Sequence, residues 1–224
     1  AIARLRNVPG VRLVALFAPE HGVRGEAQAG EYVPFMIDAA SGLPVFSLYG
    51  PSQKPQPDML GDIDAFMRTF DTTGEDKALR PEMTRGIDVL LFDIQDIWTR
   101  VYTYAATMPY AMQACAAAGL DFVVLDRPNP VTGAILEGPV LESPEFSSFI
   151  GLYPIPLRHG MTIGEMALLI NDRFLEKKAK LTVIPVKGWT RGLWFDETGL
   201  PWVTPSPNMP TLDTAVVYPG QVLF

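Results

Sequence analysis

The chain has 224 residues and a formal net charge of −7, with 48% hydrophobic and 19% charged residues. This length allows one large domain, or one domain plus part of another, with a core that needs no disulfide to hold it. An acidic chain lacks the basic face that is typical of a nucleic-acid binder, and no apolar run reaches the roughly 18 residues of a membrane span. The single cysteine, Cys115, excludes an intrachain disulfide and is expected to be buried.

The first half of the chain alternates short apolar runs with one helical pattern. Runs rich in β-branched residues predict buried strands at 11–17, 44–48 and 87–94. Between the second and the third, apolar residues at helical spacing predict a helix over 59–70, followed by a charged, solvated insertion over 71–80. The near-continuous apolar character of the strands is typical of parallel strands that are covered on both faces.

The second half continues the alternation. A helix is predicted over 103–118, with Gly119 placed where a left-handed residue ends a helix. Another is predicted over 162–175, and it opens with Thr162 and Glu165 at the spacing of a capping box. Further strands are predicted at 121–126, 181–186 and 214–218, with a loop-rich segment at 129–156.

Strands that alternate with helices predict an α/β fold with right-handed crossovers. We expect a Rossmann-like, largely parallel sheet with helices on both faces. Glycine and proline become frequent after Lys180, which predicts a Rossmann-like domain over residues 1–180 and the beginning of a smaller C-terminal α+β domain over 181–224. Since the sequence ends within an apolar segment, we expect this second domain to be truncated.

Polar side chains follow the first four predicted strands. In open α/β sheets, ligands bind beyond the carboxyl ends of the strands. The four strands lead into Glu20-His21, into Tyr49-Gly50, into Asp93 and Asp96, and into Asp126-Arg127 with Asn129. Four strand ends that bring polar groups to the same edge predict a site at that edge.

Each of these residues also has a structural interpretation. Glu20 can cap a helix or pair with Arg24. Asp93 can be a buried residue bonded to backbone N–H groups, which leaves Asp96, beyond the strand, as the more exposed carboxylate. Internal pairing or packing is equally open for Asp126, Arg127, Tyr102 and Tyr104.

His21 and His159 are the only histidines, and both lie in predicted loops beside a glycine. A metal site would join them with a carboxylate such as Asp96. The His-Glu-x-x-His spacing and a cysteine cluster are both absent, so we predict no metal. The glycine-rich signatures of nucleotide-binding loops and the Gly-x-Ser-x-Gly of α/β serine hydrolases are absent too, so we predict no cofactor.

Five motifs follow one another along nearly the whole chain. They are Pro19-Glu20-His21-Gly22-Val23-Arg24-Gly25, then Asp93-Ile94-Gln95-Asp96 with Arg100-Val101-Tyr102-Thr103-Tyr104, then Leu125-Asp126-Arg127-Pro128-Asn129-Pro130, then Arg158-His159-Gly160-Met161-Thr162-Ile163-Gly164-Glu165, and Pro205-Ser206-Pro207-Asn208-Met209-Pro210. Together and in this order they resemble the NamZ-type exo-β-N-acetylmuramidase family.

The resemblance implies a Rossmann-like catalytic domain, a smaller C-terminal domain and a cleft between them. It implies hydrolysis of the β-1,4 bond after a terminal, non-reducing N-acetylmuramic acid in peptidoglycan fragments. It also implies a bacterial envelope or secreted setting, such as the periplasm. The chain departs from the family pattern in a longer segment over 53–80, in Trp98 where a glycine is expected, and in lacking the family's opening strand and C-terminal portion.

Glycoside hydrolysis needs an acid that protonates the leaving oxygen and a second group that stabilises or attacks the anomeric carbon. Glu20 is the first choice, with Asp96 or else Asp93 as its partner and His21 beside them. A carboxyl separation of about 5 Å predicts retention and roughly 6.5–9.5 Å inversion, unless the 2-acetamido group of the substrate replaces the nucleophile. Binding of the lactyl carboxylate is assigned to Arg100, Arg127 or Arg158, and other substrate contacts to Tyr102, Tyr104, Asp126, Asn129, His159 and Asn208.

Two other functions remain open at this point. One is a metal-dependent hydrolase that uses His21, His159 and a carboxylate. The other is a non-catalytic module that binds muropeptides without cutting them. The expected partner is a sugar derived from peptidoglycan, with no nucleic acid and no membrane span, and the oligomeric state is left open.

Overall fold

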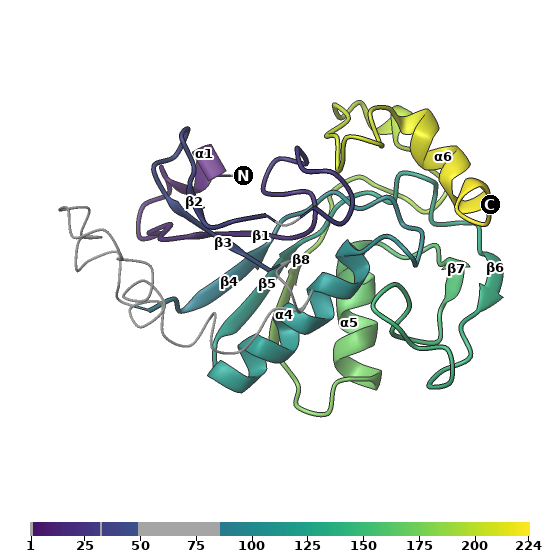
Figure 1. The fold of residues 1–224 in the computed structure, drawn as a ribbon, viewed down its shortest axis with the longest axis horizontal. Helices are drawn as coiled ribbons and strands as arrows, with labels where there is room; N and C mark the ends of the chain where they lie inside the picture. Colours follow the sequence, from purple (N-terminus) through teal and green to yellow (C-terminus); the bar gives the residue numbers. More distant parts are fainter. Residues whose placement is uncertain (1, 32, 49–85) are drawn as a thin grey trace.

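The computed structural model describes residues 2–31, 33–48 and 86–224. The predicted helix over 59–70 and the predicted insertion over 71–80 lie outside the described residues. In chain order the elements are α1 (Ile2–Leu5), β1 (Leu16–Ala18), β2 (Met36–Ile37), β3 (Pro44–Ser47), β4 (Val89–Phe92), α4 (Tyr104–Ala118), β5 (Asp121–Leu125), β6 (Glu137–Val140), β7 (Pro156–Arg158), α5 (Ile163–Arg173), β8 (Lys180–Ile184), the 3-10 turn Asp196–Thr198 and α6 (Leu212–Gln221) (Figure 1).

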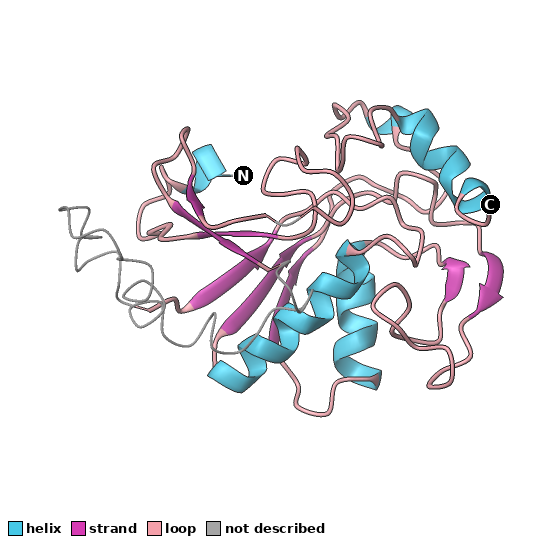
Figure 2. Ribbon diagram, in the orientation of Figure 1, coloured by secondary structure: helices cyan, strands magenta, loops and turns pink. Residues whose placement is uncertain are grey.

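The described strands form two three-stranded sheets and a separate pair (Figure 2). The first sheet has the order β1-β3-β2, with β1 and β3 parallel and β2 antiparallel. The second has the order β4-β5-β8 and is parallel throughout. The predicted α/β fold with a largely parallel sheet is confirmed, and the carboxyl ends of β1, β4 and β5 lead into the predicted site loops.

The helices α4 and α5 pack on the same face of the second sheet, since they contact each other and both contact β5 and β8. Leu90, Phe122 and Val124 point into the resulting core, which Met112 and Met166 of the two helices complete. The edge strand β4 of this sheet borders a cavity that α1 also lines. A helix on the opposite face of the sheet stays a prediction, because α4 and α5 both lie on the same face.

Local sequence signals define the ends of these two helices as predicted. Gly119 adopts a left-handed conformation with φ of 76°, and its N–H bonds to the carbonyl of Cys115, which ends α4. At the beginning of α5, the Thr162 hydroxyl accepts the N–H of Glu165, while the Glu165 carboxylate accepts the N–H of Thr162. The predicted capping box is therefore confirmed.

The predicted strand over 214–218 is wrong, because this segment lies within α6. Its β-branched residues favour a strand by local preference. Burial instead follows helical spacing: Ala215 is fully buried and Tyr218 packs edge-on against the ring of Tyr102, whereas Val216 is exposed. Packing of one helical face against the rest of the fold has overridden the local preference.

Other boundaries differ more modestly from the predictions. Of the run over 11–17, only Leu16 and Phe17 belong to a strand, β1. The segment over 129–156, predicted as loop, contains β6, which pairs antiparallel with β7. The boundary between residues 180 and 181 stays a prediction, although β8 itself pairs with β5 in the second sheet.

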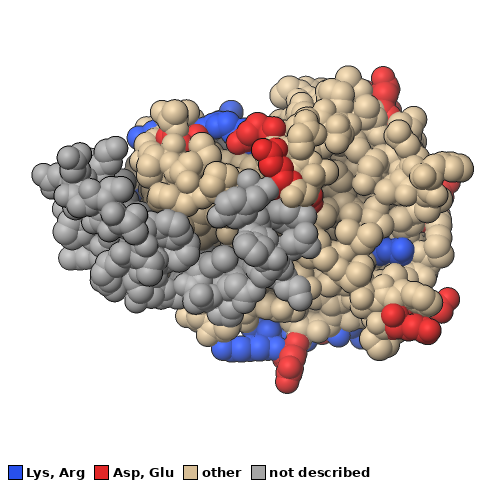
Figure 3. All heavy atoms as spheres, in the orientation of Figure 1, with Lys and Arg blue, Asp and Glu red and all other residues tan. Residues whose placement is uncertain are grey.

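The surface shows no single dominant charge on the face drawn in Figure 3. Described acidic and basic residues occur there in small groups of both signs. In the part of the chain that the structure describes, no helix is both long and apolar enough to cross a membrane.

The capping box of α5 generates a first prediction. Thr162→Ala should lower the free energy of unfolding by about 1–2 kcal/mol, because it removes the cap and one hydrogen-bond donor to Asp126. Urea unfolding measures the change. Thr162→Ser keeps the hydroxyl and is the matched control, so equal stability of the alanine and serine variants would contradict the capping role.

Candidate active site

Glu20 lies two residues after β1 and is almost completely buried. Each of its carboxylate oxygens accepts a hydrogen bond from a different part of the chain. The backbone N–H of Gly30 donates to Oε1 at 2.8 Å, and the hydroxyl of Thr103 donates to Oε2 at 2.5 Å. The alternative pairing with Arg24 is not formed, because Arg24 bonds to both oxygens of Asp38 instead. Glu20 is thus held rigidly at the carboxyl end of the first sheet.

His21 continues the same loop in a left-handed conformation, with φ of 71°. Its carbonyl accepts the N–H of Ala27, and its Nδ1 bonds to the Ala27 carbonyl at 3.0 Å. Since a carbonyl oxygen only accepts, Nδ1 is the donor in this hydrogen bond. The imidazole stacks on Tyr102 at 5.9 Å and meets the edge of Tyr104 at 6.1 Å between ring centroids.

The two tyrosines join the loop of Glu20 to the C-terminal segment. Their rings pack edge to face at 5.1 Å, and Tyr104 donates its hydroxyl to the carbonyl of Pro205 at 2.6 Å. The Tyr102 hydroxyl is buried without a hydrogen-bond partner among the described residues, and Ser206 is the polar side chain beside it. Burial raises the pKa of both phenols, so both are neutral hydrogen-bonding groups.

Asp96 follows β4 and is more deeply buried than the sequence suggested. Its Oδ1 accepts the N–H of Trp98 at 2.7 Å, whereas Oδ2 has no partner among the described residues. This turn places Trp98 in a left-handed conformation with φ of 61°, which explains why a glycine is expected there. Burial raises the pKa of Asp96 to about 7, because the apolar surroundings disfavour its charged form.

Glu20 and Asp96 share one neighbourhood. The negative charge of each raises the pKa of Tyr102, Tyr104 and Tyr218, so all five side chains interact electrostatically. Of the seven described buried side-chain atoms without a partner, five lie between Asp96 and Tyr102. Since buried polar groups are normally paired, such a concentration makes this segment part of the candidate site.

Other predicted site residues lie in structural arrangements. Asp126 accepts the N–H of Gly164 at 2.8 Å and the hydroxyl of Thr162 at 2.9 Å, so its carboxylate binds the beginning of α5. Asn129 is fully buried, donates to the Met161 carbonyl at 3.0 Å and accepts the N–H of Val131. Their predicted contacts with substrate stay untested, and both side chains already shape their loops.

His159 and Asn208 differ in their surroundings. His159 is buried, and its Nδ1 accepts the N–H of Met161 at 3.3 Å. Burial lowers the pKa of His159 to about 3, with the nearby positive charge of Arg100 as the second cause, so the ring is neutral. Asn208 is exposed on the loop that also carries Ser206.

No group of three His, Cys, Asp or Glu side chains with metal-binding geometry occurs among the described residues.

Two of the three predicted arginines are paired with carboxylates. Arg127 donates through Nε and Nη2 to Asp93 Oδ1, at 2.9 and 2.5 Å. Arg158 forms an ion pair with Glu137 at 2.6 Å. Arg127 and Asp93 therefore form a structural bridge between the ends of β4 and β5.

Arg100 is the exception among the three arginines. It donates through Nη1 to the carbonyls of Pro139 and Ile155, at 2.9 and 2.6 Å. Its buried Nε has no partner, and none of the described carboxylates forms an ion pair with it. Its positive charge is thus the least neutralised of the three.

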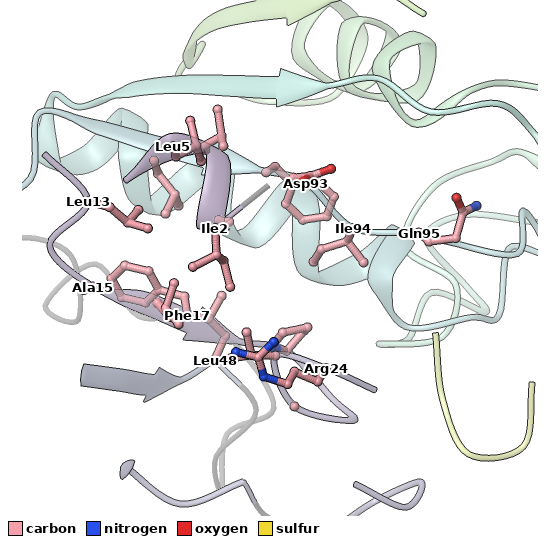
Figure 4. Close-up of a pocket in the computed structure, with 18 of the residues that line it drawn as sticks. Ile2, Leu5, Leu13, Ala15, Phe17, Arg24, Leu48, Asp93, Ile94 and Gln95 are labelled. Atoms are coloured by element: carbon pink, nitrogen blue, oxygen red, sulfur yellow. The ribbon is translucent and has the colours of Figure 1, made fainter. Parts of the chain in front are cut away.

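A cavity of about 630 Å³ lies between β1 and β4, each of which pairs on one side only among the described strands. Its lining is mainly apolar, with Arg24, Asp93 and Gln95 among its polar residues (Figure 4). Glu20 and Asp96 do not line it. The cavity and the carboxyl cluster adjoin at Tyr104, which belongs to both.

Sequence reasoning missed Thr103 and Gly30 as partners of Glu20. Gly30 donates through its backbone, and no side-chain pattern indicates such a bond. Thr103 belongs to the second motif, but the sequence predicted only that it begins a helix. Its position directly after Tyr102, in a segment already assigned to the site, is the signal that could have indicated its contact with Glu20.

Two buried carboxyl groups in different environments, with the imidazole of His21 and two neutral phenols beside them, lie at the carboxyl ends of the strands and define the candidate site of this α/β protein. The chain belongs to the NamZ exo-β-N-acetylmuramidase family: the family model described as "Exo-beta-N-acetylmuramidase NamZ, N-terminal" matches residues 1–72 and 67–213.

Individual relatives agree with this membership. The chain is 52% identical over 216 residues to the peptidoglycan β-N-acetylmuramidase NamZ of Bacillus subtilis strain 168, covering 96% of this chain and 46% of that protein. It also resembles two crystal structures of DUF1343 family proteins from Bacteroides fragilis. The first has a TM-score of 0.79 at 40% identity, and the match covers 100% of this chain and 50% of that one. The second has a TM-score of 0.66 at 33% identity, and the match covers 93% of this chain and 48% of that one. The chain spans about half the length of these relatives.

The environment of Asp96 generates a prediction about stability and pH. Its pKa is about 7 in the folded state and near 3.8 in the unfolded state, so between these values the folded state binds the extra proton. The contribution of Asp96 to stability should therefore be fully present below about pH 4 and be lost as the pH rises through about 7. The asparagine in Asp96→Asn does not titrate. The free energy of unfolding of the wild type, minus that of this variant, should therefore decrease between about pH 4 and pH 7.

Urea unfolding at several pH values measures this difference. Asp172→Asn is the matched control, since Asp172 is exposed and its removal should leave the pH dependence as in the wild type. Parallel curves for the wild type and Asp96→Asn would contradict the buried, protonated state of Asp96.

Proposed function

We propose that this chain carries the catalytic region of an exo-β-N-acetylmuramidase. The enzyme would release terminal, non-reducing, β-1,4-linked N-acetylmuramic acid from peptidoglycan fragments. The observation that carries the proposal is the pair Glu20 and Asp96, two buried carboxyl groups with different environments that share one cluster. Family membership and the name of the Bacillus subtilis relative support the choice of substrate.

The two carboxyl groups suit different roles in glycoside hydrolysis. Asp96 retains its proton up to about pH 7 and has one oxygen without a protein partner, as a general acid requires. Glu20 accepts one hydrogen bond at each oxygen, which suits an ionised carboxylate that attacks the anomeric carbon, stabilises it or activates water there. His21, through Nε2, and the neutral Tyr102 are the groups beside them that can bond to sugar hydroxyls.

The lactyl carboxylate of muramic acid needs a cation. Of the three predicted arginines, Arg100 suits this role best, because Arg127 and Arg158 already pair with carboxylates. Guanidinium binds a carboxylate in a bidentate way, which gives selectivity for muramic acid over sugars that lack the lactyl group. A peptidoglycan substrate would be met in the bacterial envelope or outside the cell, and this location is part of the proposal.

The role of Glu20 is tested by Glu20→Gln. The wild type should release N-acetylmuramic acid from the natural disaccharide, and the variant should lose at least about a hundredfold in kcat because the amide cannot carry negative charge. Glu31→Gln makes the same change at an exposed position of the same loop region and should keep full activity. A folded wild type that binds the disaccharide without cutting it would support the muropeptide-binding module instead.

The role of Asp96 is tested with two leaving groups. Cleavage of the disaccharide should decrease as the pH rises above about 7, because Asp96 then loses the proton that the leaving oxygen needs. In an aryl β-N-acetylmuramide the leaving group is a stabilised phenolate, which needs no proton from Asp96. Cleavage of this substrate should therefore decrease little as the pH rises. Asp96→Asn should accordingly lose cleavage of the disaccharide far more than cleavage of the aryl substrate, and equal losses would contradict the acid role.

A further inference from the structure

Thr103 occupies the position before α4 at which a threonine usually caps the helix. Its hydroxyl would then accept a backbone N–H from the first turn, as Thr162 does at α5. Thr103 does not do so: its φ and ψ of −68° and −15° are helical, and its side chain forms no cap bond. The hydroxyl donates to Glu20 Oε2 instead, at 2.5 Å. The structure thus uses a capping residue for a different purpose.

This hydrogen bond joins two distant parts of the fold. Glu20 lies on the loop after β1 of the first sheet, and Thr103, 83 residues later, begins the helix that packs on the second sheet. Because Gly30 binds the other oxygen, the carboxylate is held from two sides. The terminal torsion of a glutamate has no sharp preference of its own, so these two donors determine the plane of the carboxylate.

The surroundings of Thr103 also favour a negative charge at this point. The beginning of α4 contains no acidic residue in its first turn. The positive end of a helix dipole and a hydroxyl donor both stabilise an anion there. A carboxylate that attacks or stabilises a developing positive charge must be correctly oriented, and the bond from Thr103 serves this requirement.

We propose that Thr103 is a positioning residue for Glu20: its hydroxyl fixes the carboxylate in the orientation that acts on the anomeric carbon of the sugar. The proposal rests on the proposed muramidase function. The competing interpretation is that the bond only ties the two sheets together, in which case its loss lowers stability and leaves kcat of the folded enzyme unchanged.

The test is Thr103→Val, which removes the hydroxyl and keeps the shape of the side chain. We expect kcat for N-acetylmuramic acid release to decrease about 10- to 100-fold, the range of a hydrogen bond to a charged group, with KM nearly unchanged. Thr103→Ser keeps the donor and should restore most of kcat. Thr107→Val is the matched control, because Thr107 lies one turn further along α4 and donates to the Thr103 carbonyl rather than to Glu20.

A double-mutant cycle separates the two interpretations. If Thr103 acts through Glu20, adding Thr103→Val to Glu20→Gln should cost little further kcat, whereas independent effects would multiply. An active wild type whose Thr103→Val variant matches Thr107→Val in kcat would overturn the positioning role and leave the muramidase function standing. A folded wild type that releases no N-acetylmuramic acid would overturn the proposed function, and the role of Thr103 with it.

Discussion

Polar side chains at the carboxyl ends of the parallel strands are buried or half-buried, and leaving them unpaired there is costly. This constraint connects the parts of the fold. Asp126, after β5, is satisfied by the beginning of α5, and Glu20, after β1, by Thr103 and Gly30. The cost of leaving such a group unpaired, about 1–3 kcal/mol, is a substantial part of the stability of a whole domain. The helices are therefore docked by polar bonds as well as by the apolar core.

The same constraint distinguishes two groups of predicted site residues: those that fix loops and those that can bind substrate. Asp126 and Asn129 have their hydrogen-bonding capacity used within the protein, which suits residues that fix loops. Asp96 Oδ2 has no such partner, the Tyr102 hydroxyl has only Ser206 beside it, and both belong to the cluster around Glu20. A buried atom with hydrogen-bonding capacity to spare can bind a substrate hydroxyl or the glycosidic oxygen. The two groups of residues therefore have different roles.

Local and periodic signals carried most of the fold prediction. The apolar runs predicted the parallel strands, and the signals at Gly119 and Thr162 predicted the ends of α4 and α5, because these depend on neighbours in sequence. The rule for strand ends led to Glu20 and Asp96. The segment over 214–218 was mistaken for a strand because the contact of Tyr218 with Tyr102, which favours the helix, comes from a residue more than a hundred positions away.

Thr103 shows the limit of predictions from local sequence patterns. Thr162 has glutamate at the third following position and forms a reciprocal capping box, whereas Thr103 has Ala106 there and no partner for one. The Thr103 hydroxyl forms no cap bond and donates to Glu20 instead. Which group it serves depends on how the loop after β1 lies beside the beginning of α4, and no local pattern contains that information. The residue that orients Glu20 is therefore found only when the sheets are seen together.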